Sequence, residues 1–331
     1  MKNGIAFAGS LIVDHLKFVK TWPARGALSK IDRQSYVLGG LANNCAIDVA
    51  KLDPSVPVQV IGLVGNDAKG DLILDTFANY DSIDTGNIRR KGETAFTDVM
   101  TTPDGSRTFF TFMGSNADLV PADFDFDNIH ADILHIGYLL LLDGLDAPDP
   151  TYGTAMCRVL AEARAHGIAT SIDVVSEDSD RYTNIVPPAL KYADYCIVNE
   201  VEAERTTGIP LRDGSAPRYE NIEKGVRALA AMGVRRWTVV HMPELSAVYD
   251  AEADEYYAEP SRKVPDGYIK SSVGAGDAFA VGMLYGAYHG WDIRRSLRTA
   301  SAIAAYSLAG ESASDAIGPI DEILSEVDGW Q

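Results

Sequence analysis

Cysteine, clustered histidine and long apolar runs are scarce in this chain of 331 residues. Its three cysteines, Cys45, Cys157 and Cys196, are too far apart for a disulfide framework or a C-x-x-C zinc site. The six histidines form no H-E-x-x-H or comparable ligand set, so a structural metal is not expected. The apolar run 133–142 is too short to cross a bilayer, and the first residues lack the basic start of a signal peptide. These features predict a cytoplasmic protein that does not bind membranes.

Positive charge is also scarce. Lys and Arg number 29 against 47 Asp and Glu, which gives a formal net charge of −18. Such a surface repels the phosphate backbone of nucleic acids, so we expect no nucleic-acid partner. A small anionic ligand is not excluded, because a local group of backbone N–H groups acts at short range while distant charges are screened beyond about 10 Å.

Short β-branched runs alternate with amphipathic helical patterns along most of the chain. The runs predicted as buried strands are 58–65, 132–137, 169–175, 194–199 and 237–241, and the clearest helical patterns are 153–166 and 220–232. This alternation predicts an α/β fold with a doubly wound, mostly parallel sheet flanked by helices, with ligands beyond the carboxyl ends of the strands. No linker or internal repeat is visible, so residues 1–331 are expected to form one domain.

Two segments interrupt this alternation. Residues 14–38 and 93–113 contain strand patterns and turn residues with no helix between them. We expect them to form a small antiparallel sheet that projects from the main domain as a lid.

The most informative stretch is 271–284, with the sequence S-S-V-G-A-G-D-A-F-A-V-G-M-L. Its residues 274–276 let the backbone approach a ligand closely, and the small residues from Ala278 predict a helix whose free N–H groups form an anion hole. Asp277 lies at the start of that helix, where an ionised carboxylate can take a proton from a hydroxyl that attacks a phosphoryl group. A glycine-rich turn with a capping aspartate explains the same residues.

A second glycine-rich stretch spans residues 39–50. Gly39 and Gly40 lead into a predicted helix whose first turn carries Asn43. This arrangement brings backbone close to a polyhydroxylated ligand, and the amide can both donate and accept hydrogen bonds. A plain turn and helix cap is the alternative.

The two stretches, in this order and separation, resemble the paired motifs of the ribokinase-like carbohydrate kinases, also called the phosphofructokinase-B family. Residues 63–70 resemble the family's post-strand turn, 114–117 its strand returning from the lid, and 199–202 its Asn-x-x-Glu motif. The resemblance covers nearly the whole chain. It implies a ribokinase-like fold and ATP-dependent phosphorylation of a hydroxymethyl group on a sugar or sugar-like substrate.

The resemblance also implies which residues carry the chemistry. Asp277 would be the general base that deprotonates the acceptor hydroxyl. Gly274, Ala275 and Gly276 would stabilise charge on the transferring phosphoryl group.

The sugar hydroxyls would be bound by the residues that match the family's substrate site, namely Asp14, Gly39, Gly40 and Asn43.

The Asn-x-x-Glu motif implies a magnesium site. Asn199 and Glu202 would order the water shell of Mg²⁺ bound mainly to nucleotide phosphates. A capping box at a helix start explains the same pair. Asp173, at a predicted strand end, is a further candidate for this region, although a turn aspartate is the favoured interpretation.

The chain departs from the family beside the expected nucleotide. The usual Thr-x-Gly-x-x-Gly turn is replaced by residues 241–246, which contain no glycine and place Glu244 where phosphates approach. His241 is either a nucleotide contact or a neutral histidine at a strand end. Ser271 stands where many relatives have a cation-binding aspartate, so a monovalent cation is not implied. Ser301 lies on a small-residue helix that resembles the one beside the adenine.

Two other functions stay open on the sequence. A nucleoside kinase of the same fold would use lid aromatics for base stacking, and Tyr36, Phe96, Phe110 and Phe112 are available. A catalytically weak ligand-binding or regulatory protein would explain the altered 241–246 turn. The resemblance also implies a homodimer formed through the lid.

Overall fold

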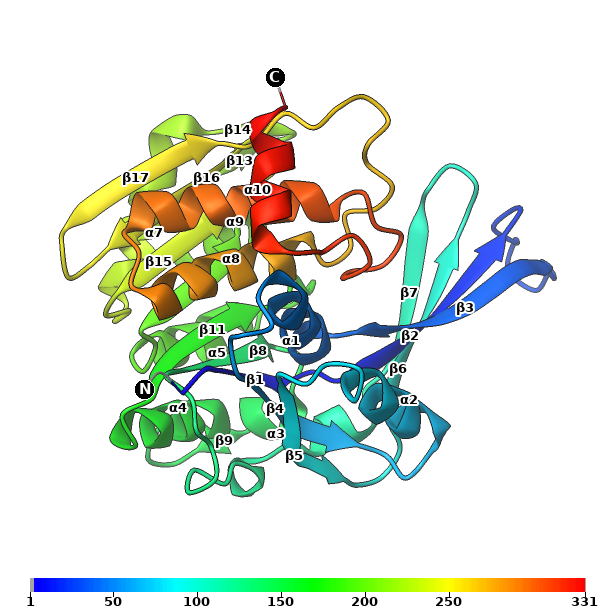
Figure 1. The fold of residues 1–331 in the computed structure, drawn as a ribbon, viewed down its shortest axis with the longest axis horizontal. Coiled ribbons are helices and arrows are strands. Elements are labelled where there is room, and N and C mark those ends of the chain that lie inside the picture. The colour runs from blue at the N-terminus through cyan, green and yellow to red at the C-terminus, as the bar shows by residue number, and fades with distance from the viewer. Residues whose placement is uncertain (1–2, 331) are drawn as a thin grey trace.

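A nine-stranded sheet crosses the centre of the computed structural model, which describes residues 3–330 (Figure 1). The order of its strands is β17-β16-β15-β12-β11-β8-β1-β4-β5. The strands are β1 (Ile5–Gly9), β4 (Val58–Val64), β5 (Ile83–Arg90), β8 (Ile133–Leu139), β11 (Ala169–Val174), β12 (Tyr195–Asn199), β15 (Trp237–His241), β16 (Leu245–Asp250) and β17 (Glu255–Pro260). Only β16 and β17 run antiparallel to their neighbours. The predicted doubly wound, mostly parallel sheet is confirmed.

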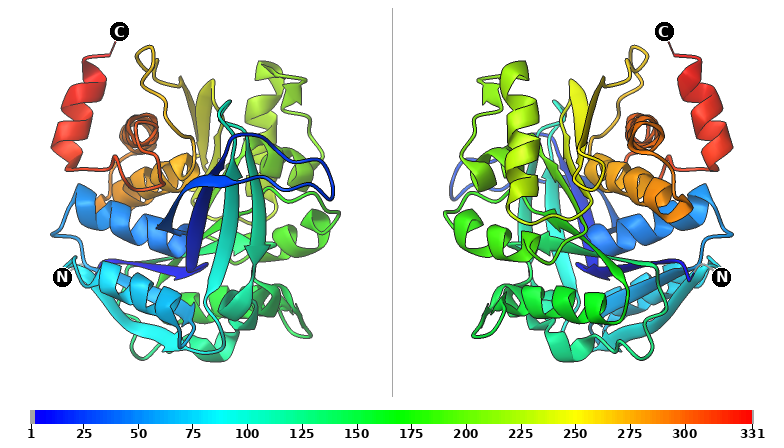
Figure 2. Two further views of the ribbon diagram at one scale, coloured as in Figure 1. Left: turned by 90° about the vertical axis from the view of Figure 1, so that its right-hand side faces the viewer. Right: turned by 90° about the vertical axis from the view of Figure 1, so that its left-hand side faces the viewer.

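Helices cover both faces of this sheet, as Figure 2 shows from two sides. One layer contains α1 (Leu41–Leu52), α2 (Ala68–Phe77), α8 (Ala275–His289), α9 (Ile293–Ser307) and α10 (Ile320–Asp328). The other contains α3 (Asp143–Asp146), α4 (Ala155–Ala165), α5 (Tyr182–Leu190), α6 (Glu200–Thr207) and α7 (Tyr219–Ala231). Each layer buries its own apolar cluster against the sheet, which is why the central strands read as continuous apolar runs.

A separate four-stranded sheet projects from the main body (Figure 1). It contains β2 (Ile12–Val19), β3 (Ile31–Gly39), β6 (Ala95–Thr101) and β7 (Arg107–Phe112), in the order β3-β2-β6-β7. Both hairpins are antiparallel, as expected for the two lid segments. The hairpins join through a parallel pairing of β2 with β6, so the lid sheet is mixed.

The segment after the lid differs from the sequence-based interpretation. Gly114–Asp118 forms a 3-10 helix and not a returning strand, and Pro121–Asp123 forms another. The Asn116 side chain binds both backbone groups of Leu11, with the amide and carbonyl contacts each at 3.3 Å. These two contacts hold the segment after β7 beside Leu11, which lies between β1 and β2.

The remaining elements are two short hairpins: β9 (Pro148–Asp149) with β10 (Gly153–Thr154), and β13 (Arg212–Asp213) with β14 (Ala216–Pro217). Across residues 3–330, no helix has the length and apolar character needed to cross a bilayer. The three cysteines are buried free thiols.

Candidate active site

Two adjoining cavities lie where the carboxyl ends of β12 and β15 meet the start of α8. The larger has a volume of about 540 Å³ and the smaller about 150 Å³. Asn199, His241 and Gly276 line both cavities, so the two share a wall. This is the sheet edge at which doubly wound folds bind their ligands.

The start of α8 forms part of that shared wall. Gly274 caps the helix with φ of +80°, and a Cβ atom there would lie 2.4 Å from Ala313 Cβ, so this position requires glycine. Ala275 is the first helical residue, which places Gly276 and Asp277 in the first turn. A helix leaves the N–H groups of its first turn without intrahelical partners. The predicted anion hole therefore faces the two cavities.

The Asp277 carboxylate lies in the smaller cavity and is only 4 % exposed. Its Oδ2 accepts a hydrogen bond of 2.7 Å from the Asn44 amide, and its Oδ1 accepts one of 2.6 Å from the Tyr138 hydroxyl. Burial raises the pKa of Asp277, and the two hydrogen bonds oppose this shift by stabilising the ionised form. The carboxylate is thus fixed in place and aimed at the cavity.

The 39–50 stretch begins α1, as predicted. Gly40 caps the helix with φ of +86°, and a Cβ atom there would lie 2.6 Å from the Ser10 carbonyl oxygen. A Cβ atom on Gly39 would lie 2.2 Å from Asp14 Oδ2. Gly40 is therefore needed because the Ser10 backbone packs against it, and at Gly39 a Cβ atom would displace the Asp14 carboxylate.

Asn43, in the first turn of α1, holds the junction between the main sheet and the lid. Its amide nitrogen donates to the carbonyls of Gly39 at 2.7 Å and Ile12 at 3.1 Å. Its Oδ1 is buried and, within the part of the chain that the structure describes, has no hydrogen-bond partner; the same is true of Ser10 Oγ. The next residue, Asn44, contacts Asp277. The structure thereby connects the two glycine-rich motifs.

Asp14 lies on β2, where the first strand of the main sheet passes into the lid. Burial raises its pKa to about 6, while a hydrogen bond with Thr97 and the positive charge of Arg107 act in the opposite direction. Asp14 pairs in register with Thr97 of β6, which pairs with Thr111 of β7. Side chains alternate between the faces of a sheet, so Arg107 belongs to the same lid face as Asp14.

Asn199 and Glu202 form the capping box of α6. The Asn199 side chain accepts from the backbone N–H groups of Val201 and Glu202, and Glu202 Oε2 accepts from the backbone N–H of Asn199 at 2.9 Å. Glu202 Oε1 also accepts from the Ser176 hydroxyl at 2.7 Å. The capping interpretation is confirmed, and it orients the pair toward the smaller cavity.

Three carboxyl groups face this small cavity: Asp173, Glu202 and Asp277. Burial raises the pKa of Glu202 to about 7. The pKa of Asp173 is raised well above its usual range by burial and by the nearby charges of Glu202 and Asp277. Asp173, the penultimate residue of β11, also accepts from the backbone N–H of Val174 at 2.7 Å, so it lies in a strand and not in a turn. These three carboxyl groups would repel one another if all were ionised.

The turn that replaces the family's glycine-rich motif joins β15 to β16. His241 packs on Phe279, with ring centroids 4.9 Å apart, and burial lowers its pKa to about 4, so it is neutral. Glu244 does not line either cavity. Its carboxylate receives two hydrogen bonds from Arg212, of 3.0 and 2.7 Å, and the same guanidinium binds Glu200. The acidic residue expected beside the phosphates is thereby paired with Arg212 and lies outside both cavities.

The lining of the larger cavity is mostly apolar. Ser301 lines it, and its hydroxyl lies 3.0 Å from that of Ser246. Met242 and Pro243 of the 241–246 turn and Ala304 and Ala305 of the small-residue helix also line it, as the resemblance implies. The contributors that the sequence interpretation did not include are Ser261, Arg262, Val264, Ile269 and Leu308. A pocket of this size and lining is suited to a nucleoside with a few polar contacts.

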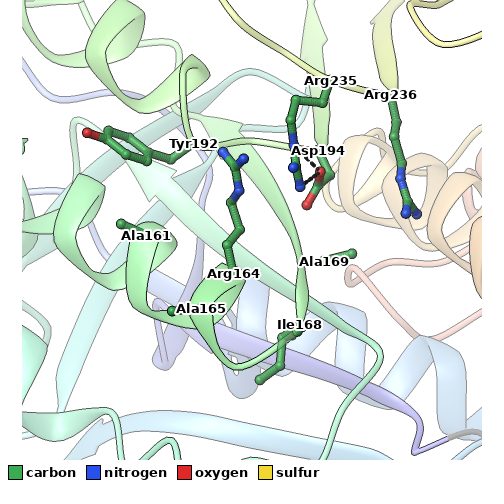
Figure 3. A pocket seen from close by; sticks show the side chains of 10 residues that line it. Ala161, Arg164, Ala165, Ile168, Ala169, Tyr192, Asp194, Arg235 and Arg236 are labelled. Carbon is green, nitrogen blue, oxygen red and sulfur yellow. Dashed lines mark hydrogen bonds and ion pairs between the residues drawn. The ribbon is translucent and has the colours of Figure 1, made fainter.

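A third hollow, shown in Figure 3, lies beside the amino ends of β11 and β12. It has a volume of about 480 Å³ and contains several arginines. Arg235 pairs with Asp194, Arg164 donates to the Lys191 carbonyl at 3.1 Å, and Arg236 donates to a tyrosine hydroxyl at 2.9 Å. These charges have partners, and the hollow is at the sheet edge opposite Asp277. It is therefore not the candidate active site.

Comparison with known proteins agrees with this geometry. The sequence pattern of the pfkB family of carbohydrate kinases matches residues 2–318. A relative from Geobacillus thermodenitrificans, named 5-dehydro-2-deoxygluconokinase, is 24% identical over 299 residues, covering 86% of this chain and 82% of the relative.

Solved structures show the same fold. The ribokinase of Thermotoga maritima has a TM-score of 0.79 at 20% identity, covering 98% of this chain and 99% of that one. The ribokinase of Arabidopsis thaliana, solved with ribose and ATP, has a TM-score of 0.77 at 20% identity and 99% coverage of both chains. The resemblance noted in the sequence is confirmed: the chain belongs to the pfkB family of carbohydrate kinases and is a phosphotransferase with the ribokinase-like fold.

Proposed function

We propose that this protein transfers the γ-phosphoryl group of ATP to a hydroxymethyl group of a sugar or sugar acid, with Asp277 as the general base. The observation that carries the proposal is the shared wall of the two cavities. It combines a helix N-terminus, a buried carboxylate and a neighbouring pocket of nucleotide size. Phosphoryl transfer needs positioning and charge stabilisation more than covalent chemistry, and these parts supply both.

Each group in the site then has one role. The first-turn N–H groups of α8 stabilise negative charge on the transferring group. The Asp277 carboxylate takes the proton of the attacking hydroxyl. Asp14 and the free Oδ1 of Asn43 accept hydrogen bonds from sugar hydroxyls, and His241 and Ser301 contact the nucleotide. Closure of the lid over the sugar would exclude water from the transfer.

Magnesium fits the smaller cavity. Across residues 3–330 there is no group of three or more His, Cys, Asp or Glu placed to chelate a metal. A Mg²⁺ ion that keeps several waters and binds mainly nucleotide phosphates needs no such group. Asn199 and Glu202 would hold part of its water shell. When bound, the ion neutralises charge on the phosphates.

Arg107 favours an acceptor that carries a carboxylate. It is half-buried on the lid face that Asp14 occupies, and among the described residues no carboxylate lies within ion-pair distance of its side chain. A half-buried arginine that forms no direct ion pair, and whose charge acts on Asp14 only at longer range, is suited to an anionic ligand. The relative from Geobacillus thermodenitrificans is named for a gluconate derivative, which is a sugar acid. We therefore place sugar acids ahead of neutral sugars.

The nucleoside kinase alternative loses support from the lid geometry. Tyr36 pairs with His15 and stacks on its ring at 4.2 Å, on the face away from Asp14. Phe96, Phe110 and Phe112 alternate onto the same far face. A base stacked on these rings would lie outside the cavity that holds Asp277.

A coupled ADP-release assay tests the proposed function. The acceptor panel contains neutral sugars, sugar acids and nucleosides, and the donor is ATP with magnesium. We expect turnover with a sugar acid above that with any neutral sugar. Turnover with nucleosides alone would favour the nucleoside kinase, and no turnover with any acceptor would favour the ligand-binding alternative.

The outer face of the lid supports the proposed homodimer. Trp22, Tyr36, Phe110 and Phe112 are each at least 42 % exposed, and Trp22 stacks on Phe110. A second copy of this apolar sheet face would cover them. Sedimentation analysis tests this: Phe110→Glu should shift a dimer to monomer, and a wild-type monomer would refute it. The cytoplasmic location stays a prediction.

A further inference from the structure

Asp277 is held from two sides by elements far apart in the sequence. Asn44 reaches it from α1 and Tyr138 from the carboxyl end of β8, and each binds a different carboxylate oxygen. Without these bonds the side chain of a residue in a first helical turn can adopt several rotamers. With them, both the rotamer and the plane of the carboxylate are fixed.

We propose that Tyr138 is a positioning residue for phosphoryl transfer, which acts with Asn44 to hold the Asp277 carboxylate ionised and oriented for proton abstraction. This inference deepens the proposed function and rests on Asp277 as the base. It assigns a role to a tyrosine that belongs to no motif in the sequence.

The direction of both hydrogen bonds supports this role. The Asn44 nitrogen can only donate. Burial and the neighbouring Asp277 charge raise the pKa of Tyr138 well above its ordinary value, so the phenol stays protonated and also donates. Two donors stabilise the ionised carboxylate, which burial alone would disfavour.

The arrangement leaves room for the acceptor hydroxyl. An ionised carboxylate has about four lone-pair sites, of which Asn44 and Tyr138 use two. Both Tyr138 and Asp277 line the small cavity, so the remaining sites are open to a hydroxyl that enters it. The base needs no rearrangement before it accepts a proton, and such preorganisation lowers the cost of reaching the transition state.

Other ionisable groups lie near Asp277 on the elements packed around it. They are Cys45 and Asp48 from α1, Asp173 from β11, His241 from β15 and Glu202 from α6. None of them donates a hydrogen bond to the Asp277 carboxylate in the described structure, so Tyr138 and Asn44 are the groups to vary.

The same helix offers a matched control. Tyr285, eight residues further along α8, donates to Asp53 Oδ2 at 2.9 Å. At 1.5 Å of rise per residue this pair is about 12 Å from Asp277 along the helix. Tyr285→Phe therefore removes the same kind of bond, here between a tyrosine on α8 and the aspartate that caps the end of α1, without touching the base.

The test measures kcat against pH for wild type, Tyr138→Phe, Asn44→Leu and Tyr285→Phe, with the best acceptor from the panel. Loss of a donor to the ionised form should move the acid limb of Tyr138→Phe to higher pH by about one unit. The plateau of kcat should fall about 10-fold because the carboxylate is less well oriented, while KM for the sugar changes little. Asn44→Leu should act in the same direction, and Tyr285→Phe should match wild type.

A second measurement does not depend on turnover. The infrared band of the protonated Asp277 carboxyl, assigned by subtracting the spectrum of Asp277→Asn, gives its titration midpoint directly. The midpoint should rise in Tyr138→Phe and stay fixed in Tyr285→Phe. An unmoved midpoint and acid limb in Tyr138→Phe would overturn the positioning role. An inactive wild-type enzyme would instead refute the proposed function.

Discussion

The substitution Asp277→Asn tests the general base most directly. The asparagine keeps the shape of the side chain and removes its ability to accept a proton. Its Oδ1 can still accept from Asn44, and its NH₂ group can donate to the Tyr138 oxygen after the phenol rotates. The cost to folding stability is therefore small, about 1 kcal/mol, because both the Asn44 and the Tyr138 contacts to position 277 can re-form.

The effect on turnover should be much larger. General-base catalysis contributes about 10²–10⁴-fold, so kcat of Asp277→Asn should fall by that factor, which corresponds to roughly 3–5 kcal/mol in the activation free energy. The affinity for the sugar should change little, because the base contacts only the reacting hydroxyl. The assays are coupled ADP release for kcat, calorimetry for sugar binding and thermal unfolding for stability.

The control is a second buried aspartate, Asp48 on α1, which lies outside the cavity. Burial raises its pKa to about 8, so it is protonated at neutral pH and Asp48→Asn is nearly isosteric with it. This variant should keep wild-type turnover. Near-full turnover in a folded Asp277→Asn protein would remove Asp277 from the mechanism.

Three further predictions follow from charges in and around the cavities. Asp14→Ala should weaken sugar binding by roughly 2–4 kcal/mol, with nucleotide binding unchanged, because sugar hydroxyls lose their acceptor; equal sugar affinity by calorimetry would exclude Asp14 from the sugar site. Glu202→Gln should raise the magnesium concentration for half-maximal activity, whereas a lower melting temperature with unchanged magnesium dependence would leave Glu202 only its capping role. The raised pKa of Asp48 means that the folded protein keeps a proton that the unfolded chain releases above its usual value of 3.8, so stability should fall as pH rises from about 4 to about 8. In urea unfolding, Asp48→Asn should reduce this fall by roughly 2–4 kcal/mol, and an unchanged slope would show that Asp48 is not the group responsible.

Much of the fold could be predicted from sequence because its elements have local signals. The central strands are continuous apolar runs, and each glycine-rich turn stands at a helix start that the structure contains. The 3-10 helix at Gly114–Asp118 was not predictable in this way. Its geometry depends on the Asn116 side chain binding Leu11, a residue 105 positions earlier.

The electrostatic effect of the altered 241–246 turn could likewise not be predicted from local sequence. A glutamate in the 241–246 segment implies repulsion of phosphates when only neighbouring residues are considered. Arg212, 32 positions earlier, binds Glu244 and Glu200 together and holds the Glu244 carboxylate outside both cavities. The pairing requires β13 to lie beside the β15–β16 turn, and no local sequence pattern predicts that arrangement.

The proposed general base combines a local sequence signal with contacts from distant parts of the chain. Asp277 is visible in the sequence because the helix start that places it is a local motif, and its proposed chemistry follows from residue type. Its ionisation depends on Asn44 and Tyr138, which are 233 and 139 positions away in the sequence. They lie beside the carboxylate because α1 and the end of β8 are close to the start of α8. Burial favours the neutral carboxyl while the two donors favour the charged one, so the balance between them decides the pH at which the base works. The motif therefore indicates the class of reaction, whereas the working pH range of this enzyme depends on side chains that only the folded structure brings to the carboxylate.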